Sequence, residues 1–246
     1  MRTEMGTPPI RILHTNDLHG RLDSGLVSLI EPYRREADLY FDSGDIIKAG
    51  NLAIPMRPEA AWGHLAHLQC TASVPGNRES HILRSALDAK LAGRTHPILC
   101  ANLYDREGSR ILPPSLTIEC NGLRIGVLGV MVPMVTERMH SKAVSQLIWT
   151  PPIEEAVSVS ADLRRDCDLV IALTHIGFRQ DQALAQASSG IDLILGGHSH
   201  TVLEQPTRVG NTWICQGGSH GRFFGQYSWK MGQGLTHSAL IPWSKS

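Results

Sequence analysis

Polar side chains of a few kinds follow at least five short apolar runs that are spread over most of this chain. Each of these runs leads into a loop-like stretch that carries aspartate, asparagine or histidine. Because an α/β fold delivers functional side chains at the carboxyl ends of its strands, the recurrence favours an α/β fold with one site there. The candidate metal ligands in these stretches are Asp17, His19, Asp45, Asn77, His175, His198 and His200.

Strand-like and helical segments alternate along the chain, with no repeat and no low-complexity linker. Apolar residues at helical spacing predict helices at 26–35, 58–68, 79–91, 153–165 and 181–188, of which 79–91 is the clearest. Short apolar runs predict strands at 10–14, 38–42, 71–74, 97–103, 115–119, 123–130, 168–173, 191–195, 213–216 and 226–231. Asn121-Gly122 predicts a hairpin turn. Strands that alternate with helices and then close in β hairpins favour a layered α/β sandwich.

Length, charge and cysteine usage narrow the class of protein. At 246 residues the chain is long enough for one large domain with a packed core. Lysine plus arginine and aspartate plus glutamate number 23 each, so nucleic acid is not an expected partner. No stretch approaches the roughly 20 apolar residues of a membrane span, and the first ten residues lack the apolar segment of a secretory signal. Five cysteines without a Cys-x-x-Cys pattern are typical of buried thiols, so we expect a cytoplasmic protein.

Two of the motifs place candidate ligands at positions i and i+2. On an extended or turning backbone, Asp17 and His19 face one side, and His198 and His200 repeat that geometry. A carboxylate combined with imidazoles suits Mn²⁺, Fe or Zn²⁺ better than Ca²⁺ or Mg²⁺. Asp45 lies between the two pairs in sequence and is the natural bridging carboxylate. Each motif alone is weak evidence, but their conjunction predicts a metal site.

The motifs, in this order and over essentially the whole chain, resemble the calcineurin-like metallophosphoesterases, and within them the 5′-nucleotidase branch. The segments that carry the resemblance are His14-Thr15-Asn16-Asp17-Leu18-His19-Gly20, Ser43-Gly44-Asp45, Gly76-Asn77-Arg78-Glu79, Leu173-Thr174-His175 and Gly196-Gly197-His198-Ser199-His200.

The resemblance implies a four-layer αββα sandwich formed by a single domain over residues 10–246, after a flexible segment 1–9. The nucleotidases of this family carry a further carboxy-terminal domain that binds the substrate, but we expect none here, because the chain ends at Ser246, where the metal domain should end.

The resemblance further implies two divalent cations, Mn, Zn or Fe, and hydrolysis of a nucleotide-type phosphate monoester or diester by a metal-bridging hydroxide. Small phosphorylated molecules would be the partners. One cation would be held by Asp17, His19, Asp45 and His200. The second would share Asp45 and be completed by Asn77, His175 and His198.

The chain departs from the family pattern directly after Asn77. The family has a histidine there, oriented by an aspartate three residues later, whereas this sequence has Arg78 and His81. Arginine binds phosphate oxygens but does not donate a proton at neutral pH. General acid catalysis typically contributes about 10²–10⁴-fold, so its loss would slow esters with poor leaving groups most. We therefore treat Arg78 and His81 as the candidate catalytic residues, with His81 as a substitute acid. The candidate substrate-binding residues are Asn77, Arg78 and His220.

Three neighbours of the motifs have plainer interpretations. We expect His14 to support a ligand rather than to bind metal, and Asn16 to cap a turn. His220 lies where the rim of the site is expected, and with Phe223 and Phe224 it is a candidate lining of the substrate cleft. Core packing of the two phenylalanines is the alternative.

Three functional hypotheses follow and stay open at this point. The first is a metal-dependent hydrolase of phosphate monoesters or diesters. The second is an enzyme of the same fold narrowed to activated, cyclic or diester substrates, because Arg78 neutralises charge without supplying a proton. The third is a non-catalytic metal- or phosphate-binding protein, against which the complete set of candidate ligands argues.

Overall fold

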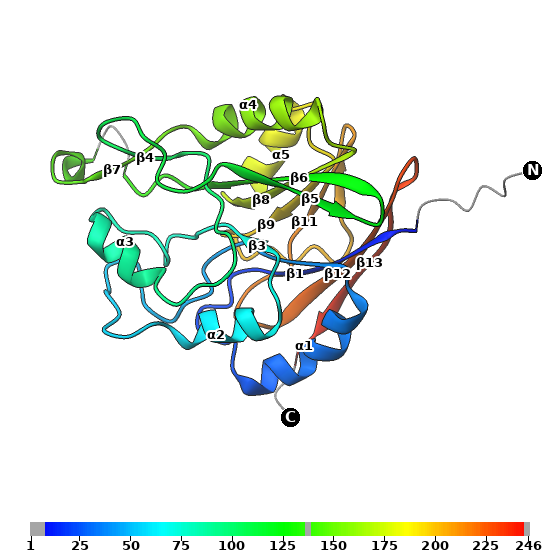
Figure 1. Cartoon of the computed structure of the whole chain (residues 1–246), viewed down its shortest axis with the longest axis horizontal. Coiled ribbons are helices and arrows are strands. Elements are labelled where there is room, and N and C mark those ends of the chain that lie inside the picture. The colour runs from blue at the N-terminus through cyan, green and yellow to red at the C-terminus, as the bar shows by residue number, and fades with distance from the viewer. Residues whose placement is uncertain (1–7, 136–138, 244–246) are drawn as a thin grey trace, which may run out of the picture.

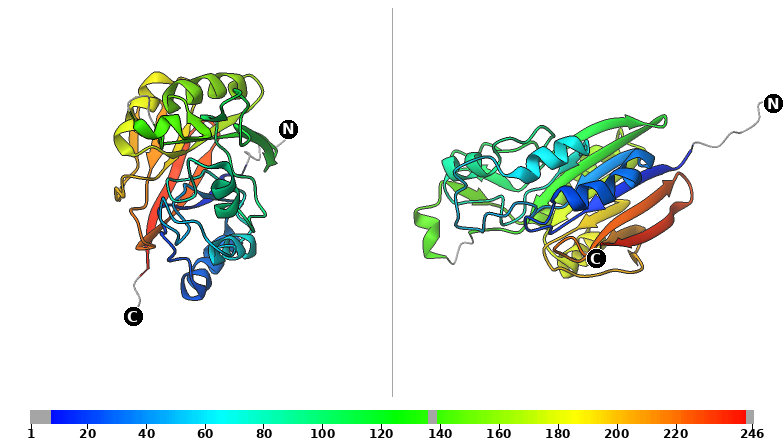
Figure 2. Two further views of the ribbon diagram at one scale, coloured as in Figure 1. Left: turned by 90° about the vertical axis from the view of Figure 1, so that its left-hand side faces the viewer. Right: turned by 90° about the horizontal axis from the view of Figure 1, so that it is seen from below.

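Two β-sheets packed face to face form the centre of the fold, and helices cover both outer faces (Figures 1 and 2). The computed structural model describes residues 8–135 and 139–243. The predicted four-layer αββα sandwich is confirmed. The expected flexible segment 1–9 lies outside the described residues except for Pro8 and Pro9.

The first sheet has five strands in the order β13-β12-β1-β2-β3. Strands β1 and β2 are parallel, as are β2 and β3, so their carboxyl ends lie at one edge of the sheet. Strand β12 pairs with β1 and β13 in antiparallel fashion and closes the sheet on the other side. The bounds are β1 Ile10–Thr15, β2 Leu39–Asp42, β3 Ala72–Ser73, β12 Phe223–Lys230 and β13 Gly234–Pro242.

The second sheet has six strands in the order β10-β11-β9-β8-β6-β5. Strands β6, β8, β9 and β11 are parallel, which brings the carboxyl ends of β8 and β9 to one edge. The predicted hairpin at Asn121-Gly122 is confirmed, and both residues have the positive φ that its turn requires. The bounds are β5 Ser115–Cys120, β6 Leu123–Met131, β8 Leu169–His175, β9 Leu193–Gly196, β10 Thr207–Val209 and β11 Thr212–Cys215.

Helices form the two outer layers. α4 and α5 cover the six-stranded sheet, while α1 and α2 lie beyond the five-stranded sheet on the opposite side of the molecule (Figure 1). A short helix, a 3₁₀ turn and a two-stranded ribbon of β4 and β7 gather at one end. The bounds are α1 Ser24–Glu36, α2 Ala60–His67, α3 Arg84–Lys90, α4 Pro152–Arg164, α5 Phe178–Ala187, η1 His140–Ala143, β4 Leu103–Asp105 and β7 Leu147–Trp149.

The side chains of strand β8 pack alternately in two hydrophobic cores, one on each face of its sheet. Leu169, Ile171 and Leu173 pack in the core between the sheets, whereas Val170 and Ala172 pack in the core beneath α4 and α5. This alternation follows from the period of two in a strand, and every residue of β8 is buried. The strand is therefore rigid up to its last residue, His175.

Two predicted elements are wrong. The helix expected at 79–91 begins only at Arg84. The residues before it form a loop, in which the carboxylate of Glu79 accepts a hydrogen bond from the backbone N–H of Gly76. The strand expected at 97–103 is absent, since the chain there crosses between the sheets. The backbone N–H of Leu99 donates to Ser73 in one sheet, and that of Ala101 donates to Gly129 in the other.

The cysteines are free, and all but Cys120 are buried, in agreement with the expectation of buried thiols. Across the part of the chain that the structure describes, the helices are too short or too polar to span a bilayer.

Candidate metal centre

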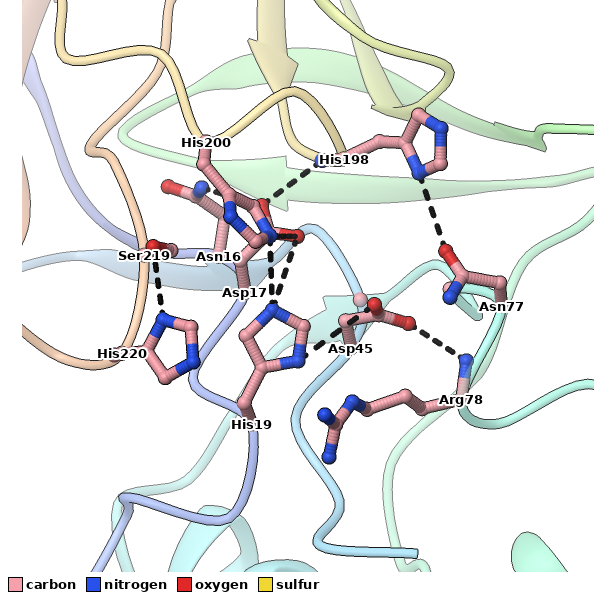
Figure 3. Close-up of polar contacts among 12 residues, drawn as sticks. Asn16, Asp17, His19, Asp45, Asn77, Arg78, His198, His200, Ser219 and His220 are labelled. Carbon is pink, nitrogen blue, oxygen red and sulfur yellow. Dashed lines mark hydrogen bonds and ion pairs between the residues drawn. The ribbon is translucent and has the colours of Figure 1, made fainter. Parts of the chain in front are cut away.

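All seven candidate ligands meet where the carboxyl ends of the two sheets face each other, and Figure 3 labels all of them except His175. Asp17 and His19 follow β1, Asp45 follows β2, and Asn77 follows β3. His175 ends β8, and the pair His198 and His200 follows β9. The parallel strands of each sheet therefore explain why residues far apart in sequence converge.

Four candidate ligands form the deeper of two groups. The Oδ1 atom of Asn77 lies 3.2 Å from Nε2 of His175 and 3.1 Å from Nδ1 of His198. Oδ1 of Asp45 lies 3.6 Å from Nε2 of His175. Ligand atoms that share a cation at about 2.0–2.2 Å lie roughly 3–3.6 Å apart, so these spacings suit one cation.

The other three candidate ligands form a group nearer to solvent. Nε2 of His19 and Nε2 of His200 lie 2.9 Å apart, and Oδ1 of Asp17 lies 3.4 Å from Nε2 of His200. Asp45 joins this group to the deeper one, because its Oδ2 atom lies 3.7 Å from the ring of His19. The His200 side chain is 42% exposed, whereas that of Asp17 is fully buried.

The backbone is strained at most of these residues. Eight described non-glycine residues have positive φ, and five of the eight are the candidate ligands Asp17, His19, Asp45, His198 and His200. Left-handed conformations are costly for such residues and occur mainly where surrounding structure holds them at functional sites. The strain therefore marks this edge of the fold as a site independently of the motifs.

A hydrogen-bond chain orients the ring of His175. Its Nδ1 atom lies 2.7 Å from the backbone oxygen of Ser43, which leaves Nε2 facing Asn77 and Asp45. Histidine ligands characteristically use their second nitrogen in this way. The Oγ atom of Ser43 lies 2.9 Å from Nε2 of buried His14, so His14 supports a candidate ligand without joining it, as expected.

The carboxylate of Asp17 connects the two sheets. Its Oδ2 atom accepts hydrogen bonds from the backbone N–H of His198 and from Nδ2 of Asn16. Asn16 also bonds to the backbone of Gly217 and Gly218, so it ties a distant loop to Asp17 rather than only capping its own turn. This arrangement leaves Oδ1 of Asp17 without a hydrogen-bond partner among the described residues.

Glu79 organises the loops after β2 and β3. Its buried carboxylate accepts hydrogen bonds from four backbone N–H groups, those of Asp45, Ile46, Ile47 and Gly76, at 2.8–3.0 Å. The same loops touch at Gly76, where an added Cβ would lie 2.2 Å from Oδ1 of Asp45. Glu79 thus fixes the bridging candidate relative to Asn77.

The electrostatics fit a bound cation. Burial raises the pKa of the Asp45 carboxyl, and burial, followed by the Arg78 cation, lowers the pKa of His19 to about 3. Burial, followed by neighbouring His175, also lowers the pKa of His198. Neutral imidazoles offer lone pairs, and Oδ1 of Asp17 and Nδ1 of His19 are buried without hydrogen-bond partners among the described residues. These donors suit divalent cations of borderline softness.

Arg78 lies beside the candidate ligands. Its backbone N–H donates to Oδ1 of Asp45 at 2.7 Å, and its Nη1 donates to the backbone oxygen of Lys48 at 3.0 Å. Its side chain runs past Asp45 toward His19 (Figure 3). The guanidinium therefore stands at the edge of the site, held by the loop after β2.

The structure does not bring His81 into the cluster. Its Nδ1 accepts a hydrogen bond from the backbone N–H of Leu83, just before α3. No hydrogen bond or ion pair found in residues 8–135 and 139–243 joins His81 to a candidate ligand. Its role as a substitute acid stays a prediction that gains no geometric support.

His220 does join the cluster. Its ring centroid lies 4.6 Å from that of His19 and 5.7 Å from that of His200. Phe224 packs in the core, as the alternative interpretation held, and Phe223 is partly exposed.

Several supporting residues escaped the sequence analysis. Oδ1 of Asn51 accepts a hydrogen bond from Nδ2 of Asn77 at 2.9 Å and so orients that amide, over a separation of 26 residues. Fully buried Lys90 donates to the backbone oxygens of Gly50, Asn51 and Arg78. In the sequence, Lys90 is only a lysine within the helix predicted at 79–91, and that pattern indicates neither its burial nor its partners.

Comparison with known proteins identifies the family. The family model of calcineurin-like phosphoesterases matches residues 10–202. The chain belongs to the calcineurin-like phosphoesterase family. The resemblance seen in the motifs is thereby confirmed, and the family is metal-dependent.

Curated relatives extend the match over most of the chain. The uncharacterized metallophosphoesterase YunD of Bacillus subtilis is 28% identical over 235 residues, which is 88% of this chain and 49% of YunD. A 5′-nucleotidase of Vibrio cholerae is 26% identical over 286 residues, covering 96% of this chain and 52% of that protein. The chain therefore spans about half the length of these relatives.

Solved structures share the fold. A putative 5′-nucleotidase from Staphylococcus aureus superposes with a TM-score of 0.81 at 18% identity, over 97% of this chain and 55% of that one. A 5′-nucleotidase precursor from Thermus thermophilus gives 0.76 at 19% identity, over 95% and 54%.

We expect Glu79→Gln to destabilise the protein. Glutamine is uncharged and has a single acceptor oxygen, so all four backbone N–H groups lose a charged partner and two of them are left buried without an acceptor. A loss of about 2–4 kcal/mol in the free energy of unfolding should result, measured by urea denaturation of metal-free protein. Glu59→Gln is the control, since the Glu59 carboxylate accepts from the backbone of Lys48 and Ala49 nearer to solvent. Equal, small losses in both variants would contradict the role of Glu79.

Proposed function

We propose that this protein is a metal-dependent hydrolase of phosphate esters that uses two cations. Asp17, His19 and His200 would hold one cation, Asn77, His175 and His198 the other, and Asp45 both. The observation that carries the proposal is the pair of donor groups with ligand-like spacings, joined by the two oxygens of Asp45.

Two cations in these positions would supply charge neutralisation and a nucleophile at neutral pH. The chain's own contribution is to fix the donors before any substrate arrives. Ser43 holds the ring of His175, Asn51 holds the amide of Asn77, and Glu79 holds the loop of Asp45. Such preorganisation avoids rearranging the site during the reaction.

Arg78 is the proposed phosphate-binding group. Its Nη1 is engaged by the backbone oxygens of Lys48 and Ile47. Nε and Nη2 make no hydrogen bond that the described residues record, so they are the donors available to two phosphate oxygens. Arg78 would orient the ester and neutralise charge, but it would not protonate the leaving oxygen.

The substrate class we propose is a small nucleotide-type phosphate ester. The relatives named as 5′-nucleotidase support this class, as does one named a trifunctional nucleotide phosphoesterase protein, YfkN of Bacillus subtilis. A second candidate is the same hydrolase restricted to diesters or esters with good leaving groups. The specific observation that favours it is Arg78, together with the position of His81 away from the donor groups.

The first test is turnover of an aryl phosphate monoester and the matching diester by metal-stripped protein reconstituted with Mn²⁺. We expect hydrolysis that requires the metal and that Asp45→Asn abolishes, because one carboxylate serves both cations. Asp88→Asn, an exposed carboxylate on α3, is the control and should keep full activity. Metal binding without hydrolysis of either ester would favour the non-catalytic hypothesis, and activity retained by Asp45→Asn would refute the bridging role.

Arg78→His tests how the site treats the leaving group. With Arg78, aryl esters should be hydrolysed faster than alkyl esters by a factor on the order of 10²–10⁴, the usual contribution of a general acid. Histidine at this position should narrow that gap by raising the alkyl rate. The measurement is kcat/KM for a series of esters whose leaving groups differ in pKa. Rates unchanged across the whole series would show that Arg78 plays no part.

A further inference from the structure

A third imidazole stands beside the solvent-side group of candidate ligands. Nitrogen atoms of His19, His200 and His220 all lie within 4.8 Å of one another. His220 lies in the loop between β11 and β12, 20 residues after His200 in sequence. From the sequence we expected His220 only to line the substrate cleft.

The loop of His220 is built onto Asp17. The backbone N–H of His220 donates to the backbone oxygen of Asp17 at 2.7 Å. Asn16 holds the same loop through its bonds to Gly217 and Gly218. His220 also has positive φ, as do five candidate ligands. Its position relative to Asp17 is therefore set by the fold even though its side chain is exposed.

The ring of His220 is also oriented. Its Nδ1 lies 2.9 Å from the Oγ atom of Ser219, a buried residue. With Nδ1 engaged in this way, Nε2 is the nitrogen that remains for a ligand, and Figure 3 shows the ring turned toward His19. A second nitrogen held by a neighbouring oxygen is the arrangement typical of metal-binding histidine.

We propose that His220 is an additional ligand of the cation held by Asp17, His19 and His200. This proposal deepens the proposed function and rests on its metal centre. The position would then have three imidazole nitrogens and the Oδ1 atom of Asp17, with Asp45 alongside. Three nitrogens and one or two oxygens favour Zn²⁺ or another borderline ion over Mn²⁺ and Mg²⁺, which prefer oxygen.

The alternative role for His220 is that of a proton donor to the leaving group, in place of the histidine that Arg78 replaces. The donor role requires no direct bond to the cation, whereas the ligand role does. Metal affinity and the electronic spectrum of a bound ion therefore separate the two roles without reference to turnover.

The test uses metal-free wild-type protein, His220→Ala and His237→Ala. His237 is an exposed histidine on β13, so its variant controls for the loss of an imidazole outside the site. Each protein is titrated with Co²⁺ followed by visible absorption, and with Zn²⁺ and Mn²⁺ in competition with a chelator.

We expect two cations per chain in all three proteins. In His220→Ala, one of the two Zn²⁺ affinities should fall by at least about tenfold, since even groups that only support a ligand contribute roughly 10–100-fold. The Mn²⁺ affinity should change less. The Co²⁺ absorption bands should change in His220→Ala and match wild type in His237→Ala.

Wild-type affinities and an unchanged Co²⁺ spectrum in His220→Ala would overturn the proposal. A loss confined to the alkaline limb of the pH–rate profile, with binding intact, would do so as well and would assign His220 to proton donation. Suppose that wild-type protein binds two cations and that His220→Ala shows the expected loss of Zn²⁺ affinity, but that wild-type protein hydrolyses no ester. The proposed function then fails and the ligand role stands. If wild-type protein takes up no cation, both fail.

Discussion

One buried carboxylate holds together the loops that carry the candidate site. Glu79 accepts hydrogen bonds from four backbone N–H groups and thereby holds the loop after β2 against the loop after β3. Asp45 stands on the first loop, and Asn77 and Arg78 stand on the second. Charged hydrogen bonds in a dry interior are strong, so these contacts fix Asp45 relative to Asn77.

A second constraint comes from the meeting of the two sheets. Asp17 accepts a hydrogen bond from the backbone of His198, and the ring of His175 bonds to the backbone of Ser43. Each contact joins a residue at the end of one sheet to a residue at the end of the other. The cost of burying carboxylates and of left-handed backbone at Asp17 and Asp45 is borne by the packed layers around them. Bound cations would offset the remaining charge.

The architecture and the members of the donor cluster could be predicted from the sequence, because both depend on short local patterns of residues. Each candidate ligand follows an apolar run, and parallel strands bring the ends of such runs together. The helix expected at 79–91 failed for a long-range reason: the carboxylate of Glu79 is used by the backbone of residues 45–47, which no periodicity reveals. The support that Asn51 and Lys90 give was invisible for the same reason. His220 was found as a rim residue, and only the loop held by Asn16 placed it beside His19.

The most direct test of the account is anomalous diffraction from crystals of the protein grown with Zn²⁺ or Mn²⁺. We expect two anomalous peaks per chain, about 3.5–4 Å apart, with Asp45 between them. One peak should be bounded by Asp17, His19 and His200, and the other by Asn77, His175 and His198. A single peak, or two peaks away from these residues, would contradict the central claim that the converging strand ends form a two-metal centre.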